Sequence, residues 1–158
     1  MIRILSIVLL LISFGAAQAA GLPTQKVLTL EAAKKMLAAA EVTANKNNFK
    51  VVMCVLDEGG HLIALTKIDE TQNGCIDLAI MKARAAVNFK GATKLAAEAL
   101  DKGKLRVLKF PDSMPVEGGI PIIVDGRVIG AIGVSGAEPE EDGMVAKAGI
   151  DGAKDLLK

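Results

Sequence analysis

Two short turns between apolar runs constrain the fold more than any other feature of this sequence. Asp57-Glu58-Gly59-Gly60 is one, and Asp125-Gly126 is the other. An Asp-Gly turn favours a hairpin because its central residues need a positive φ, which glycine adopts freely. The sequence therefore predicts two β-hairpins, and hairpins require antiparallel neighbours. The apolar runs beside the turns are residues 51–56, 61–68, 120–124 and 127–134.

Apolar residues at helical spacing predict four helices around these hairpins. Thr29 stands where an N-cap hydroxyl accepts from the first free amides of a helix that runs to about Asn45. Further helices are expected over about residues 76–88 and 93–100, and a last one begins within 138–142. Leu105–Phe110 is interpreted as an irregular strand. Helices mixed with antiparallel hairpins indicate an α+β fold and not a doubly wound parallel sheet.

Composition narrows the class of protein. The 158 residues fit one domain, and 51% apolar with 23% charged residues is typical of a packed globular chain. A formal net charge of +1 gives no electrostatic case for nucleic acid, and the absence of Trp and Tyr removes stacking platforms for single strands. Two cysteines cannot build a four-thiolate metal site. Cys54 and Cys75 either form a disulfide or remain free, with Cys54 buried in an apolar strand.

The first residues have the pattern of a secretory signal peptide. A basic start is followed by an apolar run from Ile4 to Phe14 and by the small-x-small sequence Ala17-Gln18-Ala19. The apolar run is shorter than the roughly 20 residues that span a bilayer, so no stable membrane span is expected. We therefore predict a signal peptide at residues 1–19, a single domain at 20–158, and a periplasmic or secreted protein.

Common catalytic motifs are absent from the sequence. It contains no G-x-S-x-G, no C-x-x-C and no H-E-x-x-H, and its single histidine is His61. The acidic residues at 138–142 are either a cation site or the charged start of a helix. Gly130 and Gly133 indicate either close packing or room for a ligand at the backbone. We assign no catalytic residue.

Several segments of the sequence are informative when taken in order. They are Val55-Leu56-Asp57-Glu58-Gly59-Gly60-His61-Leu62, Lys82-Ala83-Arg84-Ala85-Ala86, and Gly118-Gly119-Ile120-Pro121 leading through Asp125-Gly126 to Gly130-Ala131-Ile132-Gly133-Val134-Ser135-Gly136 and Glu141-Asp142. Together they resemble the GlcG/HbpS-like haem-binding family, which includes the carboxy-terminal domain of certain cobalamin adenosyltransferases. The resemblance covers nearly the whole chain from about Leu28 and implies a profilin-like layer: a central antiparallel sheet of about five strands flanked by helices. It also implies homo-oligomers, up to octamers, and tetrapyrrole binding by some members.

Haem needs an apolar slot, an axial donor and cations for its propionates. His61 is the candidate metal ligand, with a solvent-facing turn residue as the alternative. Lys82 or Arg84 would meet a propionate, unless both lie on an exposed helix face. Met114 would line the pocket or a subunit contact, and the macrocycle would lie between the second predicted helix and the sheet.

The main hypothesis is an exported protein that binds haem or a related tetrapyrrole, in sequestration or sensing. A second hypothesis is an enzyme or accessory protein for small organic acids such as glycolate. In that case the backbone amides of Gly118 and Gly119 would bind an anion together with Arg84. A third hypothesis is an oligomeric scaffold without a ligand.

Overall fold

The computed structural model describes residues 21–22 and 24–158. The predicted signal peptide at residues 1–19 lies outside the described residues. Among the helices that are described, none has the length and apolar character needed to cross a membrane.

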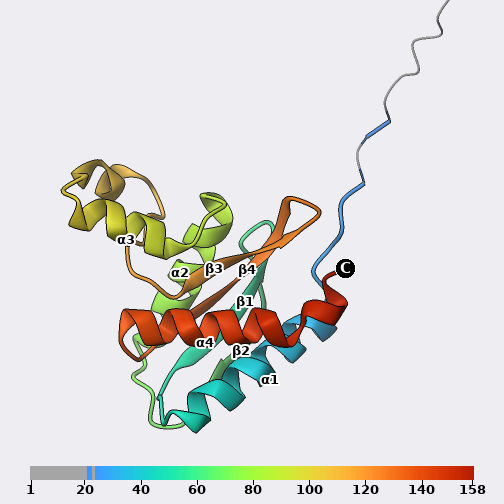
Figure 1. Ribbon diagram of the computed structural model, residues 1–158, viewed down its shortest axis with the longest axis horizontal. Coiled ribbons are helices and arrows are strands. Elements are labelled where there is room, and N and C mark those ends of the chain that lie inside the picture. Colours follow the sequence, from blue (N-terminus) through green and yellow to red (C-terminus); the bar gives the residue numbers. More distant parts are fainter. Residues whose placement is uncertain (1–20, 23) are drawn as a thin grey trace, which may run out of the picture.

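One four-stranded antiparallel sheet forms the centre of the molecule (Figure 1). Its strands follow the order β2-β1-β4-β3, so the two hairpins meet through β1 and β4. The strands are β1 (Val52–Asp57), β2 (Leu62–Lys67), β3 (Gly119–Val124) and β4 (Arg127–Ser135). The helices are α1 (Leu30–Lys46), α2 (Cys75–Asn88), α3 (Thr93–Asp101) and α4 (Pro139–Gly152), with short 3₁₀ helices η1 (Leu105–Lys109) and η2 (Lys154–Leu156).

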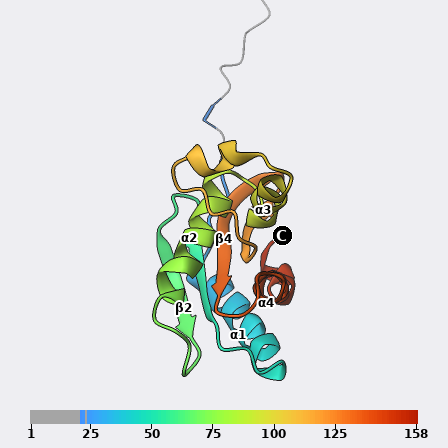
Figure 2. The ribbon, with the colours of Figure 1, turned by 90° about the vertical axis from the view of Figure 1, so that its left-hand side faces the viewer.

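The helices cover the sheet from both sides. Figure 2 shows α2 on one side of the strands and α1 with α4 on the other. Strand β1 supplies side chains to both layers: Met53 packs with α1 and α4, whereas Cys54 packs against α2. Burial on both faces explains why the sequence of β1 is a continuous apolar run without polar alternation.

Both predicted hairpins form, and their turns have the expected backbone. Asp57 Oδ1 accepts hydrogen bonds from the amides of Gly59 (2.9 Å) and His61 (2.8 Å). In the second turn Asp125 and Gly126 have φ of 50° and 73°, as a tight hairpin needs. Thr29 is the N-cap of α1, and its hydroxyl accepts from the Ala32 amide.

The α+β class is confirmed, with two corrections to the sheet. Within residues 21–22 and 24–158 it has four strands and not about five. The predicted strand at Leu105–Phe110 is wrong, because residues 105–109 form η1. This segment lies beyond the sheet with α3 and pairs with neither edge strand, β2 or β3 (Figure 1).

Both cysteines are buried and free, so the disulfide alternative is wrong. Cys54 lies inside β1 and Cys75 begins α2. Burial raises the pKa of the Cys54 thiol to about 12. A thiol in this state is a small apolar side chain of the core and not a nucleophile.

Candidate binding site

An apolar cavity of about 240 Å³ lies where α2 ends and the segment of residues 90–115 begins. We call this segment, which contains α3 and η1, the α3–η1 lobe. It projects from the sheet at the upper left of Figure 1. The walls of the cavity include Ala85 and Phe89 from α2, Leu95, Ala96 and Ala99 from α3, and Val107, Phe110 and Met114 from the rest of the lobe.

Small side chains on α3 leave the space open. Ala96 and Ala99 line the cavity and lie three positions apart, so they share one face of α3, and Ala92, the N-cap of α3, also lines the cavity. Two aromatic rings pack against each other in the wall: Phe89 and Phe110 have ring centroids 6.0 Å apart with 42° between their planes. Each of these two side chains is half exposed, so the cavity opens to solvent beside apolar rings.

Hydrogen bonds and an ion pair that involve side chains hold the lobe to the rest of the domain. The Gly119 amide donates to Thr93 Oγ1 at 3.0 Å, and Thr93 also lines the cavity. Lys94 pairs with Glu117 at 2.8 Å, and Asn88 donates to Asp112 at 3.3 Å.

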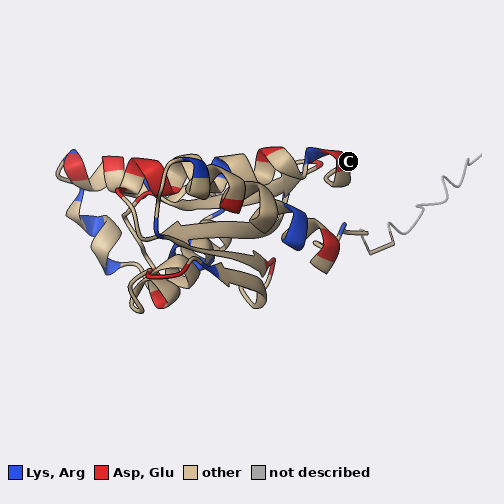
Figure 3. Cartoon of the chain, turned by 90° about the horizontal axis from the view of Figure 1, so that it is seen from below, with Lys and Arg blue, Asp and Glu red and all other residues tan. Residues whose placement is uncertain are grey.

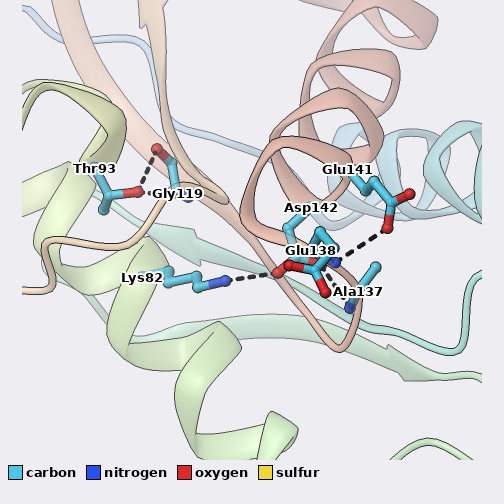
Figure 4. A network of polar contacts seen from close by, with 7 residues as sticks. All are labelled: Lys82, Thr93, Gly119, Ala137, Glu138, Glu141 and Asp142. Atoms are coloured by element: carbon cyan, nitrogen blue, oxygen red, sulfur yellow. Dashed lines mark hydrogen bonds and ion pairs between the residues drawn. The ribbon is translucent and has the colours of Figure 1, made fainter. Parts of the chain in front are cut away.

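A buried ion pair lies close to this attachment. Lys82 Nζ on α2 and Asp142 Oδ2 on α4 are 2.7 Å apart, with 3% and 2% of the side chains exposed (Figure 4). Asp142 also accepts from the Ala137 amide at 3.1 Å. Burial raises the pKa of the Asp142 carboxyl, while Lys82 and the backbone donors oppose that rise. The pair therefore joins the two helical layers and is closed to a ligand.

The predicted ligand slot between α2 and the sheet does not exist. A Cβ atom on Gly133 of β4 would collide with the Ala79 carbonyl and the Ala83 amide of α2. A Cβ on Gly130 would collide with the Leu56 carbonyl of the neighbouring strand β1. Both glycines therefore serve close packing, and that alternative is confirmed.

The predicted site residues do not gather at one place. Met114 lines the cavity, but His61 and Arg84 do not. His61 has 82% of its side chain exposed in the β1–β2 turn, with Nδ1 3.4 Å from Asp57 Oδ1. Arg84 is exposed and lies beside the same turn, because a Cβ on Gly60 would be 3.6 Å from Arg84 Cγ.

Lys82, Gly118 and Gly119 lie inside the fold. For Lys82 the exposed-face alternative is wrong, because the side chain pairs with Asp142 in the interior. The Gly118 carbonyl accepts from the Val134 amide, and a Cβ on Gly119 would collide with the Lys82 carbonyl.

The acidic residues at 138–142 are the start of a helix. Glu138 and Glu141 form a capping box, in which the Glu138 amide donates to Glu141 Oε2 at 3.1 Å (Figure 4). Within residues 21–22 and 24–158, no group of three or more His, Cys, Asp or Glu side chains could hold a metal ion. The cation alternative therefore has no support in the described part of the chain.

Sequence reasoning missed most of the cavity wall. Phe89, Leu95 and Phe110 are large apolar residues that stay half or more exposed. The sequence signal for this wall was the spacing of Ala96 and Ala99 in α3, followed by the larger residues Val107 and Phe110. Small side chains on one helix face leave a hollow when larger side chains pack opposite them. The exposed rings and that hollow make the lobe the candidate site for an apolar ligand.

The comparisons with known proteins place this fold in a family. Residues 28–151 match the family described as haem degrading protein HbpS-like. The chain belongs to the HbpS-like family. Protein GlcG of Escherichia coli K12 is 37% identical over 112 residues, which cover 71% of this chain and 84% of GlcG.

Solved structures of similar proteins share the architecture of this HbpS-like chain. A double mutant of Streptomyces reticuli HbpS superposes with a TM-score of 0.75 at 31% identity, covering 86% of this chain and 93% of that one. A complex of PduOC with haem gives a TM-score of 0.73 and covers 80% of this chain and 95% of that one. PduOC is 24% identical, so it shows the shared fold.

Proposed function

We propose that this HbpS-like protein binds haem or a related tetrapyrrole at the cavity of the α3–η1 lobe. The observation that carries the proposal is an apolar cavity walled by two phenylalanine rings and a methionine, Phe89, Phe110 and Met114. Aromatic and apolar walls with few polar groups are typical of sites for flat hydrophobic ligands. The family description and the haem complex of PduOC support the same ligand class.

The residues present fit the edge of a macrocycle. At about 240 Å³ the cavity is somewhat smaller than the roughly 300–1,000 Å³ of most ligand pockets, so part of the ring would remain outside. The half-exposed faces of Phe89 and Phe110 would cover that part. When bound, haem supplies an iron centre that accepts an axial donor. Met114 offers a thioether from the cavity wall, whereas His61 offers an imidazole from a turn outside it.

Binding is tested by titrating the purified protein with haem and following the Soret band. Ala99→Leu fills the cavity and is expected to weaken haem binding at least tenfold, with the fold retained. Ala38→Leu, at an exposed position of α1, is the control for the added volume. Equal affinity of the two variants would place haem elsewhere.

The axial ligand is tested with two further variants. Met114→Leu keeps the apolar volume and removes the sulfur donor, and His61→Ala removes the imidazole. The variant that loses the ligand shifts the Soret band, and an unchanged band removes that residue from the iron site. Because Met114 lines the cavity and His61 does not, we expect the shift in Met114→Leu.

In the organic-acid alternative, one of the two glycine amides is already engaged. The Gly119 amide donates to Thr93, and Arg84 lies at the β1–β2 turn beside Gly60. An anion would have to displace an interior hydrogen bond to reach the Gly119 amide. This geometry supports the tetrapyrrole hypothesis over the glycolate one.

We also propose that the protein acts outside the cytoplasm in haem sequestration or sensing, after removal of residues 1–19. The support is the basic, apolar and small-residue order of the first residues. Mass spectrometry of the protein from its own cells is expected to give a chain that starts at Ala20. A chain that keeps residues 1–19 would contradict export by this route.

A further inference from the structure

A run of basic residues lies in the same segment as the cavity-lining residues Val107 and Phe110. Residues 102–109 contain four basic residues and no acidic one. All four side chains are exposed, and among the residues that the structure describes none of them forms an ion pair. Figure 3 shows basic segments at the end of the molecule that α3 and η1 form. The four residues are Lys102, Lys104, Arg106 and Lys109.

The helix η1 carries both the apolar wall and part of this charge. A 3₁₀ helix has three residues per turn, so residues three apart share a face. Val107 in η1 and Phe110, the residue directly after η1, are three apart and line the cavity. Arg106 and Lys109 are also three apart and precede them by one position, which places the two cations on the neighbouring face of η1. The apolar residues that line the cavity and the two basic residues therefore alternate along η1 and the residue that follows it.

We propose that η1 recognises an anionic group on the ligand, so that the site takes an apolar molecule with one or more carboxylates at its edge. The inference rests on the proposed function and names the part of the ligand that η1 recognises. For a tetrapyrrole, these carboxylates are the propionates. Arg106 and Lys109 donate charge-assisted hydrogen bonds to them while the apolar body lies in the cavity beside the packed rings of Phe89 and Phe110.

Two haem derivatives separate charge from apolar contact. Arg106→Gln/Lys109→Gln is expected to weaken haem binding about tenfold or more, because two charge-assisted contacts are lost. Haem dimethyl ester, whose propionates are uncharged, is expected to bind this variant and the unsubstituted protein equally. Lys34→Gln/Lys46→Gln, at exposed positions of α1, makes the same change in net charge and is expected to bind haem normally.

The result that overturns the inference is haem binding by Arg106→Gln/Lys109→Gln within twofold of the unsubstituted protein. An equal loss for haem and for the ester would also overturn it, because that loss would come from packing. In either case haem still binds the unsubstituted protein, so the proposed function stands.

A second probe distinguishes failure of the proposed function from failure of the carboxylate inference. Laurate carries a carboxylate on an apolar chain and no iron, and its binding is followed by displacement of the fluorescent anion ANS. If no Soret band forms but laurate binds with at least tenfold dependence on Arg106 and Lys109, the tetrapyrrole proposal fails and the carboxylate inference stands. If neither haem nor laurate binding depends on these two residues, the inference is wrong.

Discussion

At the scale of single residues, Asp57 shows how one side chain fixes a turn. Its carboxylate accepts from the amides of Gly59 and His61, which would otherwise point into solvent at the tip of the first hairpin. The His61 amide is the largest cause that lowers the pKa of Asp57, and burial works against it. The same contacts hold the His61 backbone in the turn, so the exposed position of its imidazole follows from the chemistry of Asp57.

Asp57→Asn is expected to lower the free energy of unfolding by about 0.5–1 kcal/mol at pH 7, because a charged acceptor is replaced by a neutral one. A carboxyl whose pKa is lowered by folding stabilises the native state above its unfolded value, near 3.9, and loses that effect as the pH falls through the folded value. The difference in the free energy of unfolding between Asp57→Asn and the unsubstituted protein should therefore disappear when urea titrations are run at a pH below the folded pKa of Asp57. Asp69→Asn, at an exposed position, is the control. A gap that persists at low pH would contradict this origin.

At the scale of elements, close approach joins α2 to the sheet and one ion pair joins it to α4. Because Gly133 has no side chain, the backbone of α2 packs directly against β4. In the same way, the Lys82 carbonyl packs directly against Gly119 at the start of β3. The Lys82 side chain then reaches Asp142 of α4 in the interior (Figure 4). Removing one partner of such a pair leaves a buried charge without compensation.

Lys82→Met is expected to lower the free energy of unfolding by about 3–5 kcal/mol. Lys82→Met/Asp142→Asn should recover part of this loss, because it leaves no buried charge and keeps an acceptor for the Ala137 amide. Chemical denaturation of both single variants and the double variant measures the coupling. Additive losses would show that the two side chains do not act as a pair.

At the scale of the whole molecule, large apolar side chains remain on the surface outside the lobe. Leu78 and Met81 are partly exposed one turn apart on the outer face of α2. Surface of this kind is often covered by a second copy of the chain.

Size-exclusion chromatography with light scattering is expected to show a homo-oligomer, up to an octamer, at micromolar concentration. The expectation rests on the family resemblance and on this exposed surface. A monomer would contradict it. An oligomer that binds neither haem nor laurate would favour the scaffold hypothesis.

The sequence predicted elements better than it predicted their placement. Thr29, the Asp57 turn and Asp125-Gly126 act through neighbours in the chain, so their chemistry is visible in the sequence. The residues of η1 resembled a strand because a sequence does not show whether a partner strand lies within reach. Burial of Lys82 was also hidden, because it depends on the approach of β3 and α4 from distant parts of the chain.

The cavity could not be located for the same reason. Its walls come from α2 and from the lobe, and only their packing creates the hollow. The proline-bounded loop of Met114 predicts that this residue lines a pocket or a subunit contact, and Met114 lines this cavity. His61 was selected as the single histidine, a chemical criterion that carries no information about position.

The α3–η1 lobe occupies one uninterrupted stretch of chain between α2 and β3. Apart from the end of α2, it supplies the whole wall of the cavity, while the sheet, α1 and α4 supply none of it. Changes confined to this stretch can therefore alter what is bound without disturbing the double-layered core. Exchange of residues 90–115 for the equivalent segment of a related protein is therefore expected to change ligand selectivity while the sheet, α1 and α4 keep their structure.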